Sequence, residues 1–502
     1  MKNKLYGQDG KQAFHILICL IQVWDKADGD MVPPANNTLE IAEVESIEIS
    51  DSYRQLINKA KVRFPRGTVI RKTSETVEDL LEDARKVTAE IDNRGILLTT
   101  RKSYSAAASV ADFSVGKRIR IYLGYTTDPH IASLPKFNSK RGSIFTDSTL
   151  HEEYFDAIKA SPGYSGPIFD GYVTKCSIDT PIELECEDLA SVLKQFTTPN
   201  IEPKKDLTVN DLLAAGGKYD LLKDTGFELY PETKSCDINI GKVLFTRDLT
   251  LADVLTTWSK NHLYAYVYVD YSQDPPKPYI VVGRSYFTLN FAKGTGGKDS
   301  ILKQRERMGF PSAVDIDFNY NVADNGLTLV QSNKDFLCVQ GQCFQKDNSV
   351  YHISLIKNPD WKEGDSEDSK WRWVNESKLS KKKQRAGQSP TTSAKIDMNK
   401  YTVVPYVSRK IGCTPDELKA EMIAYYEDFH TNGIEGSLTL FGDLQLQSGI
   451  KVHLIDPYYP AKNGMYFIDE VTTKFGLGGF RQTIRLPYCI KLDSEEDEQN
   501  NQ

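Results

Sequence analysis

The chain has 502 residues and a formal net charge of −7, with 40% hydrophobic and 26% charged residues. One hydrophobic core rarely serves so long a chain, so we expect about three or four domains and no wholesale disorder. Much of the negative charge lies in a polar C-terminal tail, at Asp493, Glu495, Glu496, Asp497 and Glu498. The near-neutral remainder argues against DNA or RNA as the main partner, because a phosphate binder needs a basic face.

The first apolar segment, residues 13–24, follows three lysines. At about 12 residues it is shorter than the roughly 20 that span a bilayer, and no small-residue cleavage site follows it. We therefore expect a buried first strand, in a soluble protein that is made without export and is not an integral membrane protein.

Short strand-like runs separated by turn residues fill the chain to about residue 200 and predict a β-barrel or sandwich domain over 1–200. The runs lie at 39–50, 61–65, 118–125, 172–178 and 182–186. One helix is expected across this domain at 74–92, because Val77, Leu80, Leu81 and Ala84 recur at helical spacing.

The pattern changes at Asp206, where a mixed α/β domain over 206–335 is predicted. Residues 207–213 and 249–255 have helical spacing, and strands are expected at 263–270 and 279–282 around a proline-rich turn.

Residues 336–400 are predicted to be an irregular insertion or linker, because 358–394 combine acidic residues, a lysine run and a Gln-Ser-Pro-Thr-Thr-Ser stretch. Plain linkers do not usually carry three tryptophans, here Trp361, Trp371 and Trp373. Aromatic side chains in polar segments often anchor contacts, so these three are candidates for partner docking, with local packing as the alternative.

The last folded section, over 401–490, is predicted to contain one helix and then strands. The helix is expected at 415–430, and the strands at 437–441, 451–455, 465–471 and 482–486. An acidic disordered tail is expected over 491–502.

Motifs for catalysis, metal or phosphate binding are incomplete. The glycine-rich segment 294–298 lacks the hydroxyl of a phosphate loop, since Asp299 stands in its place, and His151 lacks the second histidine of a zinc helix. No GxSxG pentapeptide occurs, while paired carboxylates for glycoside cleavage stay open because their separation is spatial. We expect no enzyme activity, no cofactor and no metal site.

The eight cysteines contain no CxxC pair, so we interpret them as reduced core thiols. A disulfide between the neighbouring Cys338 and Cys343 is the alternative.

Two glycine-punctuated blocks carry a resemblance to a known family. The first runs through 113–125, 168–173 and 182–188, after a strand pair at 47–65, and the second runs through 436–454, 463–468 and 475–484. In this order they resemble phage baseplate and tail hub proteins, which include late-control hub proteins and are related to the base of type VI secretion spikes.

The resemblance implies a mainly β fold with α+β parts, in which two small antiparallel β-barrels of the tail-hub type flank a mixed α/β middle domain. It implies a structural hub in the virion tail tip or baseplate, assembled in the host cytoplasm. A homotrimeric ring would join the hexameric tail tube to a spike or tip protein, with the tape measure protein as a further candidate partner. The alternatives are a tail-associated cell-wall hydrolase or peptidase, and a carbohydrate-binding adsorption protein.

The two blocks also resemble each other. Each has a glycine followed by an alternating strand, then a glycine-led aromatic strand, then a second alternating strand, beginning at Gly116 and at Gly449. We therefore expect two superposable barrels with the same strand order, which would give a trimer six similar units to meet a six-fold tube.

Overall fold

The computed structural model describes residues 15–493 except 29, 35–36, 66–67, 69–70, 73–112, 135–143, 145–146, 178–180, 203–205, 242–244, 246–247, 260–262, 285–299, 312, 331–336, 345–349, 363–365, 375–400, 409–413, 430–432 and 488. The helix expected at 74–92, the glycine-rich segment 294–298 and most of the acidic tail lie outside the described residues. Strands dominate, so the mainly β prediction is confirmed.

The largest element is a twelve-stranded sheet in which every neighbouring pair is antiparallel. Its strands, in sheet order, are β15 (Val322–Val330), β20 (Gly433–Phe441), β24 (Arg481–Leu486), β23 (Glu470–Gly476), β3 (Ser46–Ser52), β4 (Lys59–Phe64), β8 (Ile182–Asp188), β7 (Phe169–Cys176), β6 (Arg118–Thr126), β1 (Ile16–Trp24), β2 (Leu39–Ile41) and β5 (Arg71–Lys72). The two sequence blocks meet where β23 pairs with β3, for example at Glu470 and Ser52.

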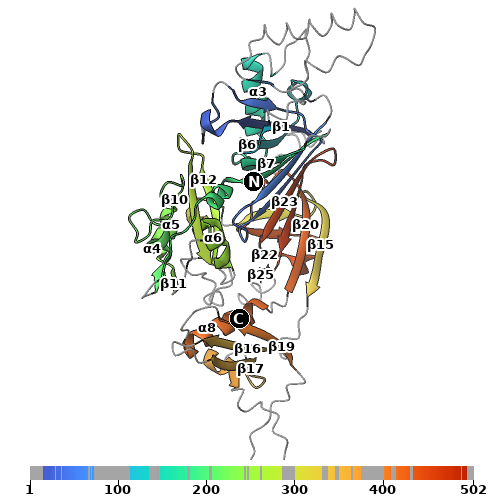
Figure 1. The fold of residues 1–502 in the computed structure, drawn as a ribbon. Coiled ribbons are helices and arrows are strands. Elements are labelled where there is room, and N and C mark those ends of the chain that lie inside the picture. The colour runs from blue at the N-terminus through green and yellow to red at the C-terminus, as the bar shows by residue number, and fades with distance from the viewer. Residues whose placement is uncertain are drawn as a thin grey trace, which may run out of the picture.

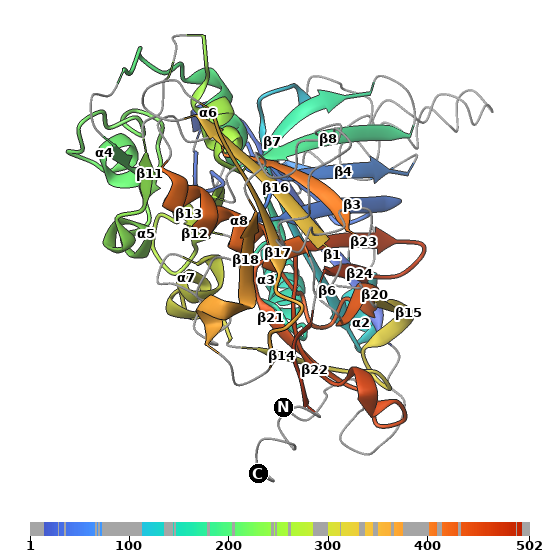
Figure 2. The same ribbon diagram turned by 90° about the horizontal axis from the view of Figure 1, so that it is seen from below.

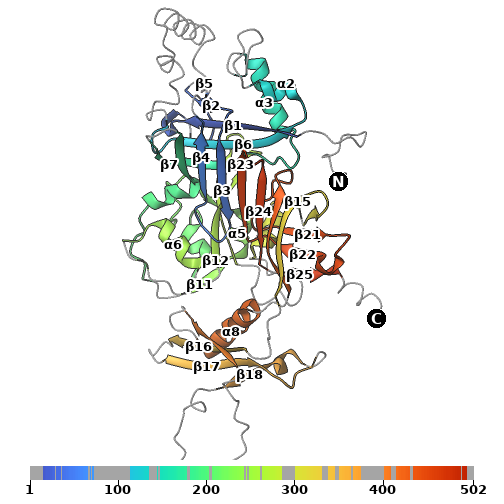
Figure 3. The same ribbon diagram turned by 90° about the vertical axis from the view of Figure 1, so that its right-hand side faces the viewer.

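The N-terminal half of this sheet curls strongly. Figure 3 shows β1 and β6 running across β3, β4 and β23. The ring of Tyr125 on β6 stacks on Phe480 in the β23–β24 turn at 5.4 Å, and its hydroxyl donates to the Phe480 carbonyl at 3.0 Å. Alternating apolar residues of six strands fill the enclosed core. The curl is barrel-like, although the described strands form no closed ring of pairings.

The C-terminal block is a sandwich of two sheets. A four-stranded sheet of β14 (Val314–Asp317), β21 (Lys451–Ile455), β22 (Gly464–Phe467) and β25 (Cys489–Leu492) covers one face of β20, β24 and β23. Val452 and Leu454 of β21 share a core with Leu438 and Leu440 of β20. A 3-10 helix, η11 (Pro460–Lys462), connects β21 to β22.

The prediction that both blocks have the same strand order is wrong. In the first block β6, β7 and β8 are consecutive neighbours. In the second, β21 and β22 lie in the four-stranded sheet, whereas β24 lies in the large one. Period-two alternation fixes which face a strand buries but not which strand it pairs with. The chain therefore lacks two barrels of equal strand order that a trimer could match to a six-fold tube.

The mixed α/β module predicted over 206–335 is present up to residue 284. Its strands are β9 (Leu207–Thr208), β10 (Glu228–Leu229), β11 (Asn239–Gly241), β12 (Leu263–Asp270) and β13 (Lys277–Arg284), and its helices are α4 (Val209–Leu213), α5 (Pro231–Cys236) and α6 (Leu251–Trp258). Capping boxes at Thr208 and Thr250 start α4 and α6. Helix α7 (Ile301–Arg307) leads into β14, so the residues after it belong to the sandwich.

A separate small domain replaces much of the irregular insertion expected over 336–400. Strands β16 (Leu337–Phe344), β17 (Val350–Lys357) and β18 (Trp371–Val374) form one sheet with β19 (Thr402–Val407), and α8 (Pro415–Phe429) packs on it. Figure 1 shows this domain below the rest of the chain. The apolar runs of β16 and β17 pair over seven residues, which outweighs the polar composition that suggested a linker.

Short helices complete the fold. Helices α2 (Pro129–Ser133) and α3 (Ser148–Lys159), which the sequence patterns did not predict, cover the outer face of β1 and β6. The remaining short helices are η1 (Lys26–Asp28), η4 (Leu189–Gln195) and η8 (Glu367–Lys370). Figure 2 shows α4, α5 and β11 on one side of the molecule and β15 and β20 on the other. No described helix is both long and apolar enough to cross a lipid bilayer.

Candidate functional site

A buried cluster of charged residues joins the large sheet to the α/β module. Alternation along β6 places Arg118 and Arg120 on one face, and Asp170 on β7 is the register partner of Arg120. Arg118 Nη2 donates to Asp170 Oδ1 at 2.6 Å, while Arg120 Nε and Nη2 donate to Oδ2 at 3.0 and 2.8 Å. One carboxylate therefore bridges two guanidinium groups. All three residues are at least 92% buried.

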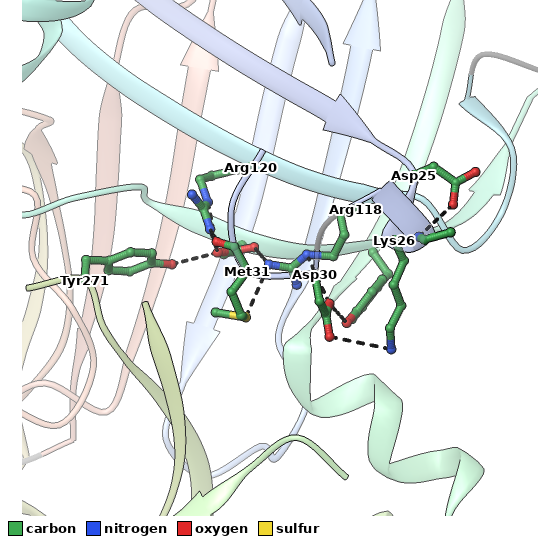
Figure 4. Close-up of polar contacts among 10 residues, drawn as sticks. Asp25, Lys26, Asp30, Met31, Arg118, Arg120 and Tyr271 are labelled. Atoms are coloured by element: carbon green, nitrogen blue, oxygen red, sulfur yellow. Dashed lines mark hydrogen bonds and ion pairs between the residues drawn. The ribbon is translucent and has the colours of Figure 1, made fainter. Parts of the chain in front are cut away.

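Aromatic rings enclose the two guanidinium groups. The ring of Trp24 lies 5.4 Å from each of them, Tyr172 lies 4.9 Å from that of Arg118, and Tyr271 lies 5.4 Å from that of Arg120. Such stacking favours a cation that has lost its water. In Figure 4, Tyr271 reaches the cluster from the opposite side to Asp30, and its hydroxyl donates to Asp170 Oδ2 at 2.9 Å. Tyr271 thereby ties the β12–β13 hairpin to the sheet.

A second anion completes the charge balance of this cluster. Asp30 is about half exposed, lies 3.9 Å from Arg118 Nε and accepts a hydrogen bond from the Tyr172 hydroxyl at 3.1 Å. Burial lowers the pKa of Arg120, but Asp170 together with Tyr122 and Tyr271 raises it, so that the pKa is raised overall. Burial, with Asp170 as a second cause, raises the pKa of Tyr271 well above its ordinary value. Two guanidinium groups thus face two carboxyl groups around the phenol of Tyr271.

The glycine of the Phe-Asp-Gly-Tyr motif allows β7 to approach β8. A Cβ added at Gly171 would lie 2.1 Å from the Glu187 carbonyl oxygen, closer than atoms can pack. Any side chain here would push β7 away from β8, directly beside Asp170. The motif that carried the family resemblance therefore also positions the charged cluster.

Next to this cluster lies a cavity of about 480 Å³. Its walls come from β3, β7, β12, the loop after α7 and residues 445–447, so it lies where the large sheet, the α/β module and the sandwich meet. Exposed Ser272 and Pro311 stand at its rim. Its volume falls within the usual range for ligand sites of roughly 300–1,000 Å³.

Two aspartates in the cavity wall hold chain segments together. Asp188 caps the start of η4 by accepting a hydrogen bond from the Ala190 amide at 3.0 Å. It also accepts a hydrogen bond from the Asn58 amide at 2.8 Å. Asp51 accepts from the Ser448 amide at 2.7 Å, and the Asn58 side chain reaches it at 3.4 Å. Burial raises the pKa of Asp188 to about 8. These carboxylates are positioned by structural hydrogen bonds, and among the described residues no group of histidine, cysteine and acidic side chains could hold a metal ion.

The structure separates the three tryptophans that the sequence singled out. Trp371 and Trp373 on β18 pack against the core of the small domain, where Trp371 meets the ring of Tyr426 at 5.0 Å. Trp361 lies in the loop between β17 and η8, where its ring nitrogen donates to the Ser366 carbonyl at 3.3 Å. Lys370 lies over the rings of both Trp361 and Trp371, at 5.6 and 5.2 Å.

Six described cysteines carry free thiols, including Cys338 and Cys343, as the sequence predicted. The charged cluster was missed, although its signal was present: two arginines two residues apart face an aspartate that precedes a glycine. Only the strand pairing reveals that they meet. The cavity has no local sequence signal, because its walls come from distant segments.

No protein-family model matches the chain, and no curated protein matches it in sequence. Several solved structures are similar to it. The tail protein from Neisseria meningitidis MC58 is 10% identical, with 93% of this chain and 96% of that chain covered and a TM-score of 0.45. The 43 kDa tail protein of prophage MuSo2 from Shewanella oneidensis is 9% identical, with 94% and 98% covered and a TM-score of 0.43.

A chain of the lidded PdpA–VgrG complex of Francisella is 10% identical, with a TM-score of 0.44; 95% of this chain and 54% of that chain are covered. Since all three TM-scores are below 0.5, we base the function on the chain's own residues.

Proposed function

We propose that the chain is a structural hub of a phage-type tail, with no catalytic role. The observation that carries the proposal is the joint between β3 and β23, which unites in one sheet the two sequence blocks that resemble hub proteins. Seven residue pairs, from Ser46–Gly476 to Ser52–Glu470, hold this joint. A sheet in which strands from both ends of the chain pair with each other suits a tail component that must transmit force without its domains separating.

The finer part of the proposal is a homotrimeric ring that joins the tail tube to a spike or tip protein. The resemblance supports a ring, and closed cyclic symmetry is the ordinary way to build one from a single chain. The proposed ring does not depend on equivalent barrels within one chain. Light scattering of the purified chain is expected to give three times 56.6 kDa. A stable dimer at the same concentrations would contradict the ring.

Docking of another tail component through the tryptophan-bearing segment stays a proposal, and Trp361 is its best candidate. Trp371 and Trp373 already pack in the small domain, so their loss would disturb the fold whether or not they dock. We expect Trp361→Ala to keep the melting temperature and weaken assembly with tail components, whereas Trp371→Ala lowers the melting temperature. Unchanged assembly of the Trp361 variant would reject the docking role.

A further inference from the structure

Arg305, on α7, is a buried cation in the wall of the cavity. It is 5% exposed and lies between two rings, with its guanidinium carbon 4.6 Å from the centroid of Tyr266 and 4.8 Å from that of Phe310. Its Nη1 donates to Gln447 Oε1 at 3.1 Å. Its Nε has no hydrogen-bond partner, and no carboxylate of the described part of the chain forms an ion pair with it.

The aspartates that line the same cavity are engaged elsewhere. Asp170 holds Arg118 and Arg120, Asp188 accepts from two backbone amides, and Asp51 accepts from the Ser448 amide. Asp270, near the rim, accepts from Ser272 and Gln273. The Tyr266 hydroxyl lies beside Arg305 in the same wall and makes no hydrogen bond to any carboxylate of the described residues. The wall around Arg305 therefore holds a cation that no carboxylate of the described residues neutralises.

A buried guanidinium without a counter-ion is costly, and buried charges in proteins are normally paired. Arginine matches a carboxylate especially well, because its planar fork donates two parallel hydrogen bonds. The cavity also offers apolar and aromatic wall, at Tyr268 and Phe310, against which a peptide could lie.

We propose that this cavity binds a carboxylate, carried by an acidic peptide segment of a partner protein, with Arg305 as its cationic ligand. A free small carboxylate is the other source of the same chemistry. The inference stands on the cavity alone and does not depend on the tail role.

Calorimetric titration of the full chain tests the site with three probes: a short end-blocked peptide containing glutamate, the same peptide with glutamine, and sodium acetate. We expect saturable binding of the glutamate peptide only, and at least about tenfold weaker binding to Arg305→Gln, as the loss of a charged hydrogen-bonded pair implies. The control is Arg307→Gln, two residues along the same helix, whose arginine pairs with Glu232 at 2.9 Å. Its affinity should equal that of the unchanged chain.

A second variant, Gln447→Glu, tests the proposed site even if Arg305→Gln fails to fold. Gln447→Glu would place a carboxylate beside Arg305 Nη1 and supply the missing counter-ion from within. We expect a higher melting temperature and loss of peptide binding. The matched control is Gln445→Glu, in the same wall, where Gln445 donates to the Leu123 carbonyl at 3.2 Å and touches no arginine. That change should lower the melting temperature.

Equal binding of acetate and peptide would support the carboxylate site and assign it to a free small ligand. The proposal is overturned if no carboxylate probe binds the unchanged chain, if Arg305→Gln binds as well as Arg307→Gln, or if Gln447→Glu is less stable than the unchanged chain.

Discussion

Two buried arginine environments lie beside one cavity, and they differ in charge balance. Arg118 and Arg120 share the carboxylate of Asp170 and have Asp30 nearby, so the charges of their cluster are balanced within the chain. Arg305 has similar aromatic neighbours but only the amide oxygen of Gln447 as a partner. The first environment can hold two modules together without help. The second is complete only when an anion is supplied.

The comparison shows that stacking and burial alone do not tell a structural arginine from a binding one. Tyrosine rings lie against Arg118, Arg120 and Arg305 alike. What separates them is whether a carboxylate of the same chain is in reach, and four substitutions measure that difference.

The largest effect is expected from Asp170→Asn. It leaves two buried guanidinium groups without their shared carboxylate, so we expect the free energy of unfolding to fall by about 3–5 kcal/mol. Urea denaturation measures it. The control is Asp156→Asn, which breaks an exposed ion pair with Lys159 and should have almost no effect. If both variants lose equally little, the cluster is not a structural clamp.

The contrast itself is tested by replacing each arginine with methionine. Arg120→Met removes one of two cations on a buried carboxylate, and we expect a loss of about 3 kcal/mol. Arg305→Met removes an unpaired charge and one hydrogen bond to an amide, so the change should stay within about 1 kcal/mol of zero. Similar losses for the two variants in urea denaturation would show that Arg305 has a counter-ion after all.

A smaller loss is expected from Tyr271→Phe, which removes only the hydroxyl that donates to Asp170. A hydrogen bond to a charged group contributes about 1.5–3 kcal/mol, and we expect the lower end because two arginines still hold Asp170. Hydrogen exchange should also show faster opening of the β12–β13 hairpin. Unchanged exchange there would mean that Tyr271 does not fasten the module to the sheet.

A further effect is a pH dependence of stability that comes from the cavity wall. Burial raises the pKa of Asp188 to about 8, so above the ordinary aspartate range the folded chain keeps a proton that the unfolded chain releases. Its contribution to stability is therefore greatest at low pH and falls as the pH rises towards 8, by at most about 1.4 kcal/mol per pH unit. Urea denaturation from pH 5 to 8 should show a steeper decline for the unchanged chain than for Asp188→Asn. Parallel curves would contradict the raised pKa.

Much of the fold could be predicted from local patterns. Alternation identified the strands at 118–125 and 182–186, and helical spacing at 207–213 and 249–255 predicted the two helices that begin after Thr208 and Thr250. Pairing order could not be predicted, because β24 and β22 have similar local patterns yet join different sheets. The small domain was not predicted, because the polar composition of 358–394 favoured a linker. The apolar runs of β16 and β17 nearby, which pair with each other, were the signal for a folded domain.

The candidate site was less predictable than the fold. The motif that carries the resemblance contains Arg118, Arg120 and Asp170. Alternation places their side chains on a face of the sheet, but it does not show whether that face contacts water or another module. The α/β module covers this face, and Tyr271 comes from 101 residues further along the chain than Asp170. Arg305 gave no signal, since a basic residue near the end of a helix is ordinary.

The central claim, that this chain is the ring-forming hub of a phage-type tail, is tested most directly by negative-stain electron microscopy of the purified full chain over a range of concentrations. The account predicts closed rings with three-fold symmetry, and it predicts that the rings persist in the Arg305→Met variant. Particles that stay single, or that pair with two-fold symmetry at every concentration, would contradict it.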